Sequence, residues 1–333
     1  MLSLGTALCL TACAASAQPP QPSLSPAKSD AAVADVLGDL DAAASAPAPN
    51  VFGDDDVPSM ADPSLRFRGD SRFEQAGLAF GQTVPGSAVT LDDVKVPVDR
   101  RGRFVLGFGQ FAEPTAELSV TFPDGTSDAR TIDIATRTFE FGGEIPVPAN
   151  QVNRFSEEDL AHIARSTKAK NAARAKPSIA EALWLEGFGW PAQGYVSSRF
   201  GKFRRYTNGD IVRPHSGVDV AAPRAPGGGP AFNFTGAEVV APSAGMVILA
   251  EPDMFFEGGL VLIDHGQNLE TAIMHLSQID VEAGQLVERG DRIGAAGSTG
   301  RSTGPHVHWS LKWHGRLVDP EPLVPPMGQG SGD

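Results

Sequence analysis

Cysteine is nearly absent from this sequence. Cys9 and Cys13 are the only two cysteines in 333 residues, and both lie close to the N-terminus. The rest of the chain can therefore form no disulfide bond and can offer no thiolate to a metal ion. Long apolar runs are missing too, because the N-terminal run over residues 2–17 is shorter than the roughly 20 residues that a membrane-spanning helix needs.

Positive charge is also scarce. The sequence has 27 Lys and Arg residues against 40 Asp and Glu residues, which gives a net charge of -13 at pH 7. This balance lacks the basic surface that nucleic-acid-binding proteins use, so we expect no nucleic acid partner. It offers no attraction to anionic membranes or wall polymers either, so a substrate of that kind would be recognised locally, within a groove.

The N-terminus has the features of a targeting segment. Residues 1–17 are small and apolar and end in Ala15-Ser-Ala17, which predicts a signal peptide. The stretch that ends at Cys13 is also typical of a bacterial lipoprotein signal, in which Cys13 would carry a lipid anchor. Both interpretations predict an exported protein, periplasmic or lipid-anchored to the envelope. Residues 18–63 are expected to form a disordered linker rich in Pro, Ala and Ser, and residues 326–333 a disordered tail.

Residues 64–150 have a different pattern. Short apolar runs alternate with Pro, Gly and Asp turns at a spacing of about 10 to 15 residues, which predicts a small β-sandwich module. The runs cover residues 77–80, 87–91, 103–108, 117–122 and 130–134.

Residues 151–188 predict a helical connector. Ser156-Glu-Glu-Asp159 is typical of a helix start, with acidic residues at the positive end of the helix dipole, and an Ala-rich stretch follows. A basic run in this stretch is interpreted as a solvated helix face, and contact with a neighbouring groove or an acidic partner is the alternative. The run consists of Arg165, Lys168, Lys170, Arg174 and Lys176.

Histidine is rare but clustered. Of the 7 histidines, four lie in three short motifs. The motifs are His215-Ser-Gly-Val-Asp219, Met274-His275-Leu-Ser277 and Gly304-Pro-His306-Val-His308. Side chains alternate along a strand, so His306 and His308 are expected to point to the same side. The spacing of His215 and Asp219 would suit a helix face, but Pro214 and Gly217 favour a loop that runs into a strand.

These residues have the chemistry of a catalytic zinc site. Such a site uses three ligands from His, Asp, Glu or Cys and keeps a fourth position open. His215, Asp219 and one member of the His306/His308 pair supply three ligands, and spacing alone does not decide which member. The other member and His275 could move a proton or stabilise an oxyanion near neutral pH. A structural pair of histidines on a strand is the competing interpretation, but it does not explain three motifs together.

Other candidate motifs are not assigned to the site. The loop over residues 297–304 lacks the Gly-Lys-Ser/Thr ending of a phosphate-binding loop, so its glycines are interpreted as turn formers. His265 and His314 each precede a glycine in a predicted turn, and His162 lies in the predicted helix. All three are interpreted as structural.

Several motifs, in order, resemble a known family. The stretch from about residue 189 to residue 322 is similar to the lysostaphin-type zinc metallopeptidases, the M23 family of peptidoglycan endopeptidases. The matching motifs are Ser198-Arg-Phe-Gly201, His215-Ser-Gly-Val-Asp219, Val240-Ala-Pro-Ser-Ala-Gly245, Ile263-Asp-His-Gly266, Met274-His-Leu-Ser277 and residues 297–308.

The resemblance implies a fold and a set of roles. The expected fold is mainly β. An antiparallel β lysostaphin-like peptidase domain over residues 189–325 is expected to follow the β-sandwich module and the helical connector along the chain. One zinc ion per domain would be held by His215, Asp219 and His308. The resemblance further implies that His306 is the general base and that His275 stabilises the tetrahedral intermediate.

The implied function is hydrolysis of peptide crosslinks in bacterial peptidoglycan by a zinc metalloendopeptidase. Two positions depart from the family pattern, Ile273 where an aromatic residue is common and Trp309-Ser310 where an acidic residue is common, which puts substrate contacts in doubt. The alternative is a noncatalytic or autoinhibited lysostaphin-like regulator that activates a cell wall amidase, with an amidase or a divisome protein as its partner. The intact ligand and histidine positions favour the enzyme.

Overall fold

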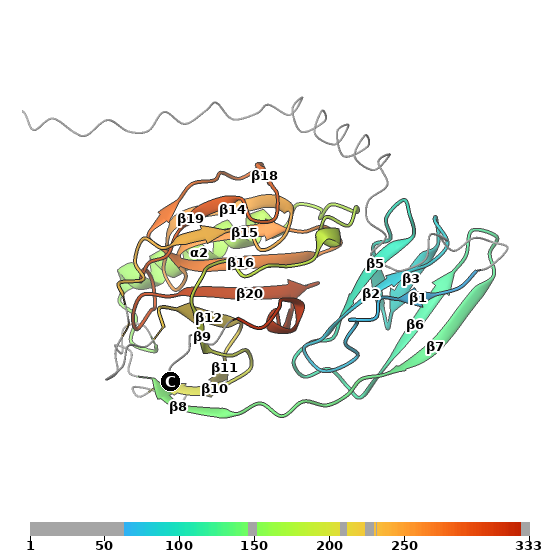
Figure 1. Ribbon diagram of the computed structural model, residues 1–333, viewed down its shortest axis with the longest axis horizontal. Helices are drawn as coiled ribbons and strands as arrows, with labels where there is room; N and C mark the ends of the chain where they lie inside the picture. Colours follow the sequence, from blue (N-terminus) through green and yellow to red (C-terminus); the bar gives the residue numbers. More distant parts are fainter. Residues whose placement is uncertain (1–62, 146–151, 207–211, 224–229, 231, 328–333) are drawn as a thin grey trace, which may run out of the picture. The chain divides into compact units, whose positions relative to one another are not determined.

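The computed structural model describes residues 63–145, 152–206, 212–223, 230 and 232–327, and these residues form a mainly β structure with one α-helix (Figure 1). The predicted mainly β fold class is therefore confirmed. The predicted signal with Cys13, nearly all of the predicted linker and residues 328–333 lie outside the described residues. Within the described part of the chain, no helix has the length and apolar character needed to cross a membrane.

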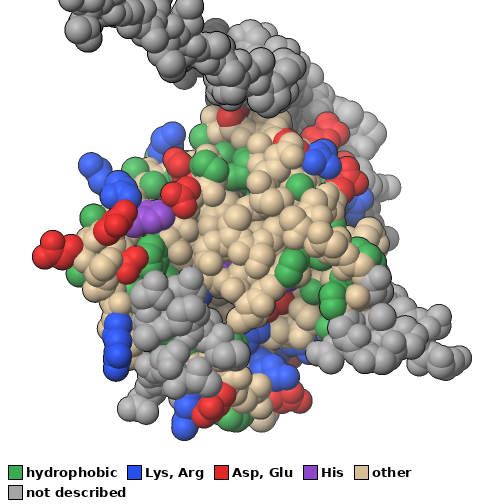
Figure 2. Space-filling model, turned by 90° about the vertical axis from the view of Figure 1, so that its left-hand side faces the viewer, with side chains coloured by type: hydrophobic (Ala, Val, Ile, Leu, Met, Phe, Trp, Pro, Cys, Tyr) green, Lys and Arg blue, Asp and Glu red, His purple; other side chains and the backbone are tan. Residues whose placement is uncertain are grey.

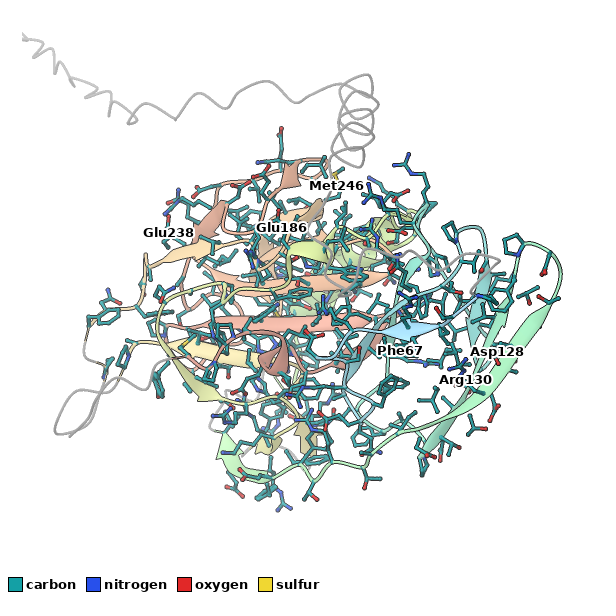
Figure 3. The ribbon with its side chains drawn as sticks, turned by 45° about the vertical axis from the view of Figure 1, so that its right-hand side comes forward. Phe67, Asp128, Arg130, Glu186, Glu238 and Met246 are labelled. Carbon is teal, nitrogen blue, oxygen red and sulfur yellow. The ribbon has the colours of Figure 1, made fainter. Side chains whose placement is uncertain are left out.

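Two antiparallel sheets make up the N-terminal module, in the strand orders β1-β2-β5 and β4-β3-β6-β7. Their strands are β1 (Arg66–Phe67), β2 (Leu78–Gln82), β3 (Ala88–Leu91), β4 (Val94–Val96), β5 (Arg103–Gly107), β6 (Thr115–Thr121) and β7 (Ser127–Asp133). Each strand-like run of the sequence overlaps one of β2, β3, β5, β6 and β7. Alternate residues of β6 are buried, as a half-buried strand requires. Figure 3 shows Asp128 and Arg130, an ion pair on the edge strand β7.

A large antiparallel sheet follows, with the strand order β18-β14-β15-β16-β20-β12-β9 and with β21 paired to β20. Its strands are β9 (Tyr195–Ser198), β12 (Val218–Ala221), β14 (Gly245–Met254), β15 (Gly258–Asp264), β16 (Leu269–Leu276), β18 (Leu286–Val287), β20 (Val307–Trp313) and β21 (Arg316–Val318). His265 lies in the turn of the β15–β16 hairpin, as its motif predicted.

Two small sheets and two short 3₁₀ helices complete the described structure. One sheet has the order β13-β19-β17 and the other the order β11-β10-β8. The elements are β8 (Phe141–Ile145), η2 (Trp184–Glu186), β10 (Phe203–Tyr206), β11 (Val212–Pro214), β13 (Glu238–Val240), β17 (Gln278–Ile279), β19 (Arg292–Ala295) and η3 (Glu321–Leu323).

The large sheet is covered on both faces. Every residue of β15 is buried. Val261 and Ile263 belong to the main core, whereas Leu260 and Leu262 belong to a second apolar cluster on the opposite face. A strand that is buried on both faces reads as a continuous apolar run, and β15 has that pattern.

Helix α2 (Glu157–Arg174) covers the second face. It begins with a capping box in which Ser156 and Asp159 exchange side-chain to backbone hydrogen bonds, as the sequence predicted. Ala173 is buried in the second cluster and Ala169 packs against it. Small side chains at these positions let the helix backbone approach the sheet closely.

The basic run of α2 differs from the prediction. Lys170 forms an ion pair with Glu257, and the Nη2 atom of Arg174 lies 2.6 Å from Glu270 Oε1, while Lys168 is exposed. The interpretation of the whole run as a solvated face is therefore wrong for Lys170, which is partly buried, whereas Arg174 is exposed and forms its ion pair at the surface. The physical reason is that the alanine face brings the helix near the sheet, where Glu257 in the β14–β15 turn and Glu270 on β16 lie within reach of long basic side chains.

The N-terminal module and the large sheet share one apolar core. A Cβ atom on Gly107 of β5 would lie 2.5 Å from the Cβ atom of Trp313 in β20, so glycine is required for this contact. Gln267 donates from Nε2 to the backbone oxygen of Arg103 over 2.8 Å. In addition, β8 pairs in parallel with β10. Removal of the module would therefore expose apolar surface of the large sheet.

Candidate metal centre

His215 and Asp219 lie on a loop and on the strand that follows it. His215 comes directly after β11, and Asp219 is the second residue of β12. The loop-to-strand conformation is the one that the sequence favoured. Between them, a Cβ atom on Gly217 would lie 2.1 Å from the backbone oxygen of Trp309, so a glycine is needed for β12 and β20 to approach here.

His308 reaches the same place from the opposite strand. It pairs directly with Asp219 in the β12–β20 register, which places both side chains on one face of the sheet. His306 lies just before β20, and its Nε2 atom is 3.6 Å from Asp219 Oδ1. His306 and His308 thus reach the same carboxylate, as strand alternation predicted.

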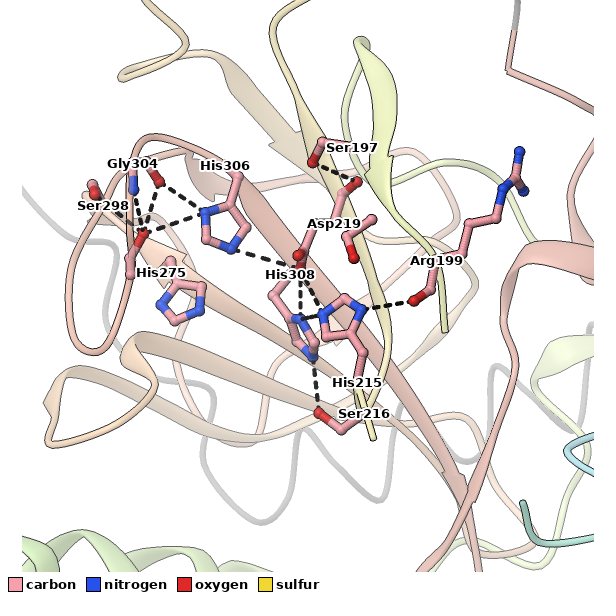
Figure 4. Close-up of polar contacts among 12 residues, drawn as sticks. Ser197, Arg199, His215, Ser216, Asp219, His275, Ser298, Gly304, His306 and His308 are labelled. Carbon is pink, nitrogen blue, oxygen red and sulfur yellow. Dashed lines mark hydrogen bonds and ion pairs between the residues drawn. The ribbon is translucent and has the colours of Figure 1, made fainter. Parts of the chain in front are cut away.

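Three ligand atoms converge at this point (Figure 4). His215 Nε2 lies 3.0 Å from Asp219 Oδ1 and 3.1 Å from His308 Nδ1, and His308 Nδ1 lies 2.8 Å from Asp219 Oδ1. Tetrahedral ligands with zinc bonds of about 2.0–2.1 Å lie about 3.3 Å apart, so the three atoms are close to that arrangement. Among the described residues, these three form the group whose spacing suits a metal ion, and all are buried.

The hydrogen bonds around the two imidazoles test whether a cation fits. His215 Nδ1 lies 2.9 Å from the backbone oxygen of Arg199, which can only accept, so Nδ1 carries the proton. In the neutral ring Nε2 is then an acceptor, and it faces the Asp219 oxygen, which is also an acceptor. Two acceptors at this separation need either a second proton on the His215 ring or a metal cation between them, and a metal cation fits the position. Ser216 Oγ lies 3.2 Å from His308 Nε2, an outer contact typical of metal-binding histidines.

The charge states also suit a metal ion. Burial acts to raise the pKa of the Asp219 carboxyl, but the charges and hydrogen bonds of His215 and His308 outweigh it and hold this pKa well below its usual range. Burial lowers the pKa of His308 to about 4. Asp219 is therefore anionic and His308 neutral near pH 7, which are the forms that bind metal. The donor set of two imidazoles and one carboxylate fits zinc.

Arg204 is part of the site although sequence reasoning missed it. Its Nη2 atom donates to Asp219 Oδ2 over 2.9 Å, and it also contacts Ser198. The residue lies on β10, and no spacing relates it to the histidine motifs. The one available signal was chemical, because a buried carboxylate needs a partner for each of its oxygens.

His275 is placed by a β-bulge that the sequence did not reveal. The β15–β16 register shifts between Gly259 and Val261, opposite the end of β16. His275 has a φ of 66°, in the left-handed region that few residues other than glycine adopt. Bulges of this kind redirect a side chain next to a functional site. The His275 ring centroid lies 4.7 Å from that of His306.

Backbone oxygens orient the rings of His275 and His306. His275 Nδ1 donates to Thr299 O over 2.8 Å, and His306 Nδ1 donates to Gly304 O over the same distance. The carbonyl oxygens only accept, so the neutral rings carry their protons on Nδ1 and leave lone pairs on Nε2. Burial, followed by the charges of His306 and His308, lowers the pKa of His275 to about 3.

The remaining histidines lie apart from this group, as the sequence indicated. His265 is fully buried, with Nδ1 2.7 Å from Ala244 O and Nε2 2.8 Å from Thr271 Oγ1. His162 lies on α2 with Nε2 2.9 Å from Asp253 O. His314 lies in the turn between β20 and β21. The hydrogen bonds of His265 give it a structural role within the hairpin.

The space-filling view in Figure 2 shows the side of the molecule at the left of Figure 1. In the described part of that face, Lys, Arg, Asp and Glu side chains lie mainly toward the margins. The centre is mostly backbone and uncharged polar side chains. Charges of both signs occur together at the margin.

Comparison with known proteins finds similarity to one family. Residues 213–320 match the profile described as peptidase family M23. A Haemophilus influenzae protein described as an uncharacterized metalloprotease is 38% identical over 128 residues, which is 38% of this chain and 25% of that protein. The Vibrio cholerae peptidoglycan DD-endopeptidase ShyA is 38% identical over 124 residues, 37% of this chain and 26% of that protein. The chain thus spans about a quarter of the length of these curated relatives.

A solved structure extends the likeness beyond the matched residues. A crystal structure of a Pseudomonas aeruginosa protein assigned to peptidase M23 is similar over 76% of this chain and 95% of that chain. The sequence identity is 28% and the TM-score is 0.55. The structural similarity therefore covers more of this chain than the residues that match the family profile.

Proposed function

We propose, from the match of residues 213–320 to peptidase family M23, that the protein is a zinc metalloendopeptidase that hydrolyses peptide crosslinks of bacterial peptidoglycan. One observation carries the proposal. Ligand atoms of His215, Asp219 and His308 converge. Two further imidazoles, those of His275 and His306, lie beside them. Each of these two rings binds a backbone oxygen through Nδ1, which leaves the lone pair of Nε2 available.

His215, Asp219 and His308 would hold one zinc ion. When bound there, zinc would supply Lewis acidity that polarises a carbonyl group and makes water a better nucleophile. Asp219 compensates part of the positive charge, and Arg204 and Ser216 orient the ligands from outside.

We assign the general base to His306. Its Nε2 atom lies 3.6 Å from Asp219 Oδ1, and Gly304 O accepts the proton on Nδ1, so the ring can take a second proton and remain oriented. In this proposal His306 takes a proton from the attacking water and gives it to the amine that leaves. A positioned acid or base of this kind contributes about a hundredfold to ten-thousandfold in rate.

We assign stabilisation of the tetrahedral intermediate to His275. Its Nδ1 proton is committed to Thr299 O, so the Nε2 lone pair can accept a hydrogen bond from the hydroxyl group that the tetrahedral intermediate keeps from the attacking water. Burial lowers the pKa of His275 to about 3, which keeps the ring neutral near pH 7 and this lone pair available.

The names of the relatives support a proposal for the substrate. ShyA, which is similar to this chain, is named a peptidoglycan DD-endopeptidase. We propose the same class of substrate here, with cleavage between D-alanine and a diamino acid, and a location outside the cytoplasm, where peptidoglycan lies. The lipid anchor through Cys13, and an amidase or divisome partner, stay predictions from the sequence alone.

A regulator that activates an amidase is the second candidate, and nothing specific in the site favours it. A noncatalytic protein would need neither the intact ligand set nor the two oriented histidines. The two candidates predict different products, so one assay can separate them.

The test uses the exported chain without its signal segment, because the module and the large sheet share a core. Purified protein is incubated with peptidoglycan sacculi, with and without a zinc chelator, and released fragments are identified by mass spectrometry. Loss of crosslinked peptides that stops with chelator and returns with added zinc is the expected result.

Two controls complete the assay. The metal content of the active protein should be one zinc per chain. If no fragments are released, but a separate amidase is stimulated, the enzyme proposal is wrong and the regulator is favoured.

A further inference from the structure

Helix α2 holds the turn between β14 and β15 from outside the site. This turn consists of residues 255–257. Lys170 forms an ion pair with Glu257, and Ser166 Oγ accepts a hydrogen bond from the Phe255 backbone nitrogen over 3.1 Å. The Phe155 ring, just before the helix, lies edge-on to Phe255 and Phe256, at centroid distances of 5.8 and 6.0 Å.

The inner side of the same turn holds His275. The His275 backbone nitrogen donates to Glu257 O over 2.8 Å. The loop over residues 297–304 is bound to the turn as well, because the Arg301 backbone nitrogen donates to Phe256 O over 2.8 Å. That loop supplies Thr299 O, the acceptor for the His275 ring. The turn therefore constrains both the backbone and the ring of His275.

The first residues of β15, directly after the turn, lie too close to the loop for the loop to stay in place when the turn moves. A Cβ atom on Gly258 would lie 2.2 Å from Thr299 Oγ1, and a Cβ atom on Gly300 would lie 2.3 Å from the Gly258 nitrogen. Gly259 also donates to Thr299 Oγ1 over 2.9 Å. A shift of the turn must therefore move Thr299 and, with it, the hydrogen bond that orients His275.

We propose that Lys170 and Ser166 of the connector helix are positioning residues for His275, which they orient through the β14–β15 turn. The inference rests on the proposed function, because His275 has a catalytic role only if the domain is a peptidase. The connector helix would then contribute to catalysis as well as cover the sheet.

The charge on Glu257 explains why Lys170 matters. The Glu257 side chain is 14% exposed, and its buried Oε2 atom has no hydrogen-bond partner among the described residues. Without Lys170, this carboxylate would lack its hydrogen-bonded cation in a buried place, and breaking a buried pair from one side is costly. The turn would have to shift to bring the carboxylate to water.

The test compares Lys170→Met and Ser166→Ala in the full exported chain, with a soluble crosslinked muropeptide dimer as substrate. We expect kcat to fall about tenfold in each variant with KM little changed, since a misplacement of about 1 Å can cost a hundredfold. Bound zinc should stay at the wild-type level. Lys170→Arg, which keeps the ion pair, should recover most of kcat.

Arg174→Met is the matched control. Arg174 also pairs a basic side chain of α2 with a strand glutamate, but its partner is Glu270 of β16, which pairs with Asp264 far along the strand from His275. This variant should lose stability as Lys170→Met does and yet keep kcat. Lys168→Met, at an exposed position, controls for loss of charge on the helix.

A readout without turnover keeps the inference separate from the proposed function. In protein labelled with ¹⁵N-histidine, the His275 Nδ1 proton that is bound to Thr299 should be visible by NMR, and His275→Gln assigns it. We expect this signal to shift or to exchange with solvent faster in Lys170→Met and Ser166→Ala, but not in Arg174→Met. If the wild type cuts no crosslink, the proposed function fails, and the NMR comparison still decides the positioning.

Other outcomes overturn the inference. An unchanged His275 signal and unchanged kcat in both variants would do so. Equal losses of kcat in Lys170→Met and Arg174→Met would show that the helix only supports the structure and does not position His275. If Lys170→Met does not fold, the Ser166→Ala result decides by itself.

Discussion

Arg204 donates from Nη2 to Oδ2 of Asp219 over 2.9 Å, so the two oxygens of this buried carboxylate have separate partners. Oδ1 faces His215 and His308, whereas Oδ2 is held by the guanidinium group. Outer contacts of this kind fix the orientation of a ligand and tune its basicity. The division of partners explains how one carboxylate can belong both to the proposed metal site and to an ion pair.

Replacement of Arg204 should therefore weaken metal binding. We expect Arg204→Ala to lower zinc affinity about 10- to 100-fold, the usual effect of removing an outer partner of a ligand. Competition with a chromogenic chelator measures the affinity. Arg205→Ala, at an exposed position on the same strand, should keep the wild-type value. Equal affinities of Arg204→Ala and wild type would show that Arg204 does not orient Asp219.

His306 and His308 should behave differently when each is replaced by alanine. His306→Ala should keep zinc and lose about a hundredfold to ten-thousandfold in kcat, because it removes only proton transfer. His308→Ala should lose zinc as well as activity, because three ligands become two. Metal analysis and muropeptide kinetics on the same samples distinguish the two effects. Loss of zinc in His306→Ala together with retention in His308→Ala would exchange the two roles.

Replacement of Gly217 by alanine should disturb the site through the backbone of β12. Gly217→Ala places a Cβ atom 2.1 Å from the backbone oxygen of Trp309, so β12 must move away from β20. We expect a loss of about 1–3 kcal/mol in the free energy of unfolding, typical of overpacking, and weaker zinc binding. Denaturant unfolding and chelator competition provide the measurements. Gly69→Ala, where nothing lies within 4 Å, should change neither.

His265 should contribute a pH-dependent part of the stability. Burial lowers its pKa from 6.5 to about 4. The unfolded chain then binds the proton more readily than the folded chain between these values, so the free energy of unfolding falls as pH falls from about 6.5 to about 4. The contribution of this residue is at most about 3 kcal/mol, from 1.36 kcal/mol for each pKa unit.

His265→Gln isolates this contribution from those of His275 and His308, whose pKa values are also lowered by burial. The free energy of unfolding of the metal-free proteins is measured by urea denaturation at several pH values. We expect a shallower fall with acid in His265→Gln than in the wild type. Identical slopes over this range would mean that His265 is not buried as the neutral ring.

Some of the fold was predictable because alternation carries local information. Ala116, Leu118 and Val120 of β6 repeat every second residue, and the period alone identifies a strand with one buried face. The start of α2 was predictable for a similar reason, since the hydrogen bonds between Ser156 and Asp159 depend on residues three positions apart. Local signals of this kind need no knowledge of distant partners.

The contacts of α2 were not predictable in the same way. Its basic residues have the spacing of a solvated face, yet Lys170 and Arg174 pair with Glu257 and Glu270, which lie 87 and 96 positions further along the chain. A charge pattern states what a residue can bind but not which partner the fold brings to it. The bulge that turns His275 has the same origin, because it depends on the register between two strands.

The sequence by itself determined which residues could do the chemistry. Three histidine motifs, an aspartate four positions after the first, and the absence of cysteine beyond residue 13 left His and Asp as the ligands of any metal site. Strand alternation further put His306 and His308 on one side. These conclusions rest on side-chain chemistry and on the two-residue repeat of a strand. Both can be identified in the sequence without knowledge of the tertiary structure.

Only the tertiary structure decided how those residues meet. The β12–β20 register sets His308 beside Asp219, Arg204 takes the second oxygen of the carboxylate, and backbone carbonyls set the proton positions of the rings. The physical reason is that a metal centre depends on distances of a few ångströms between atoms far apart in the sequence. Such distances follow from strand register, bulges and packing, and no local pattern records them.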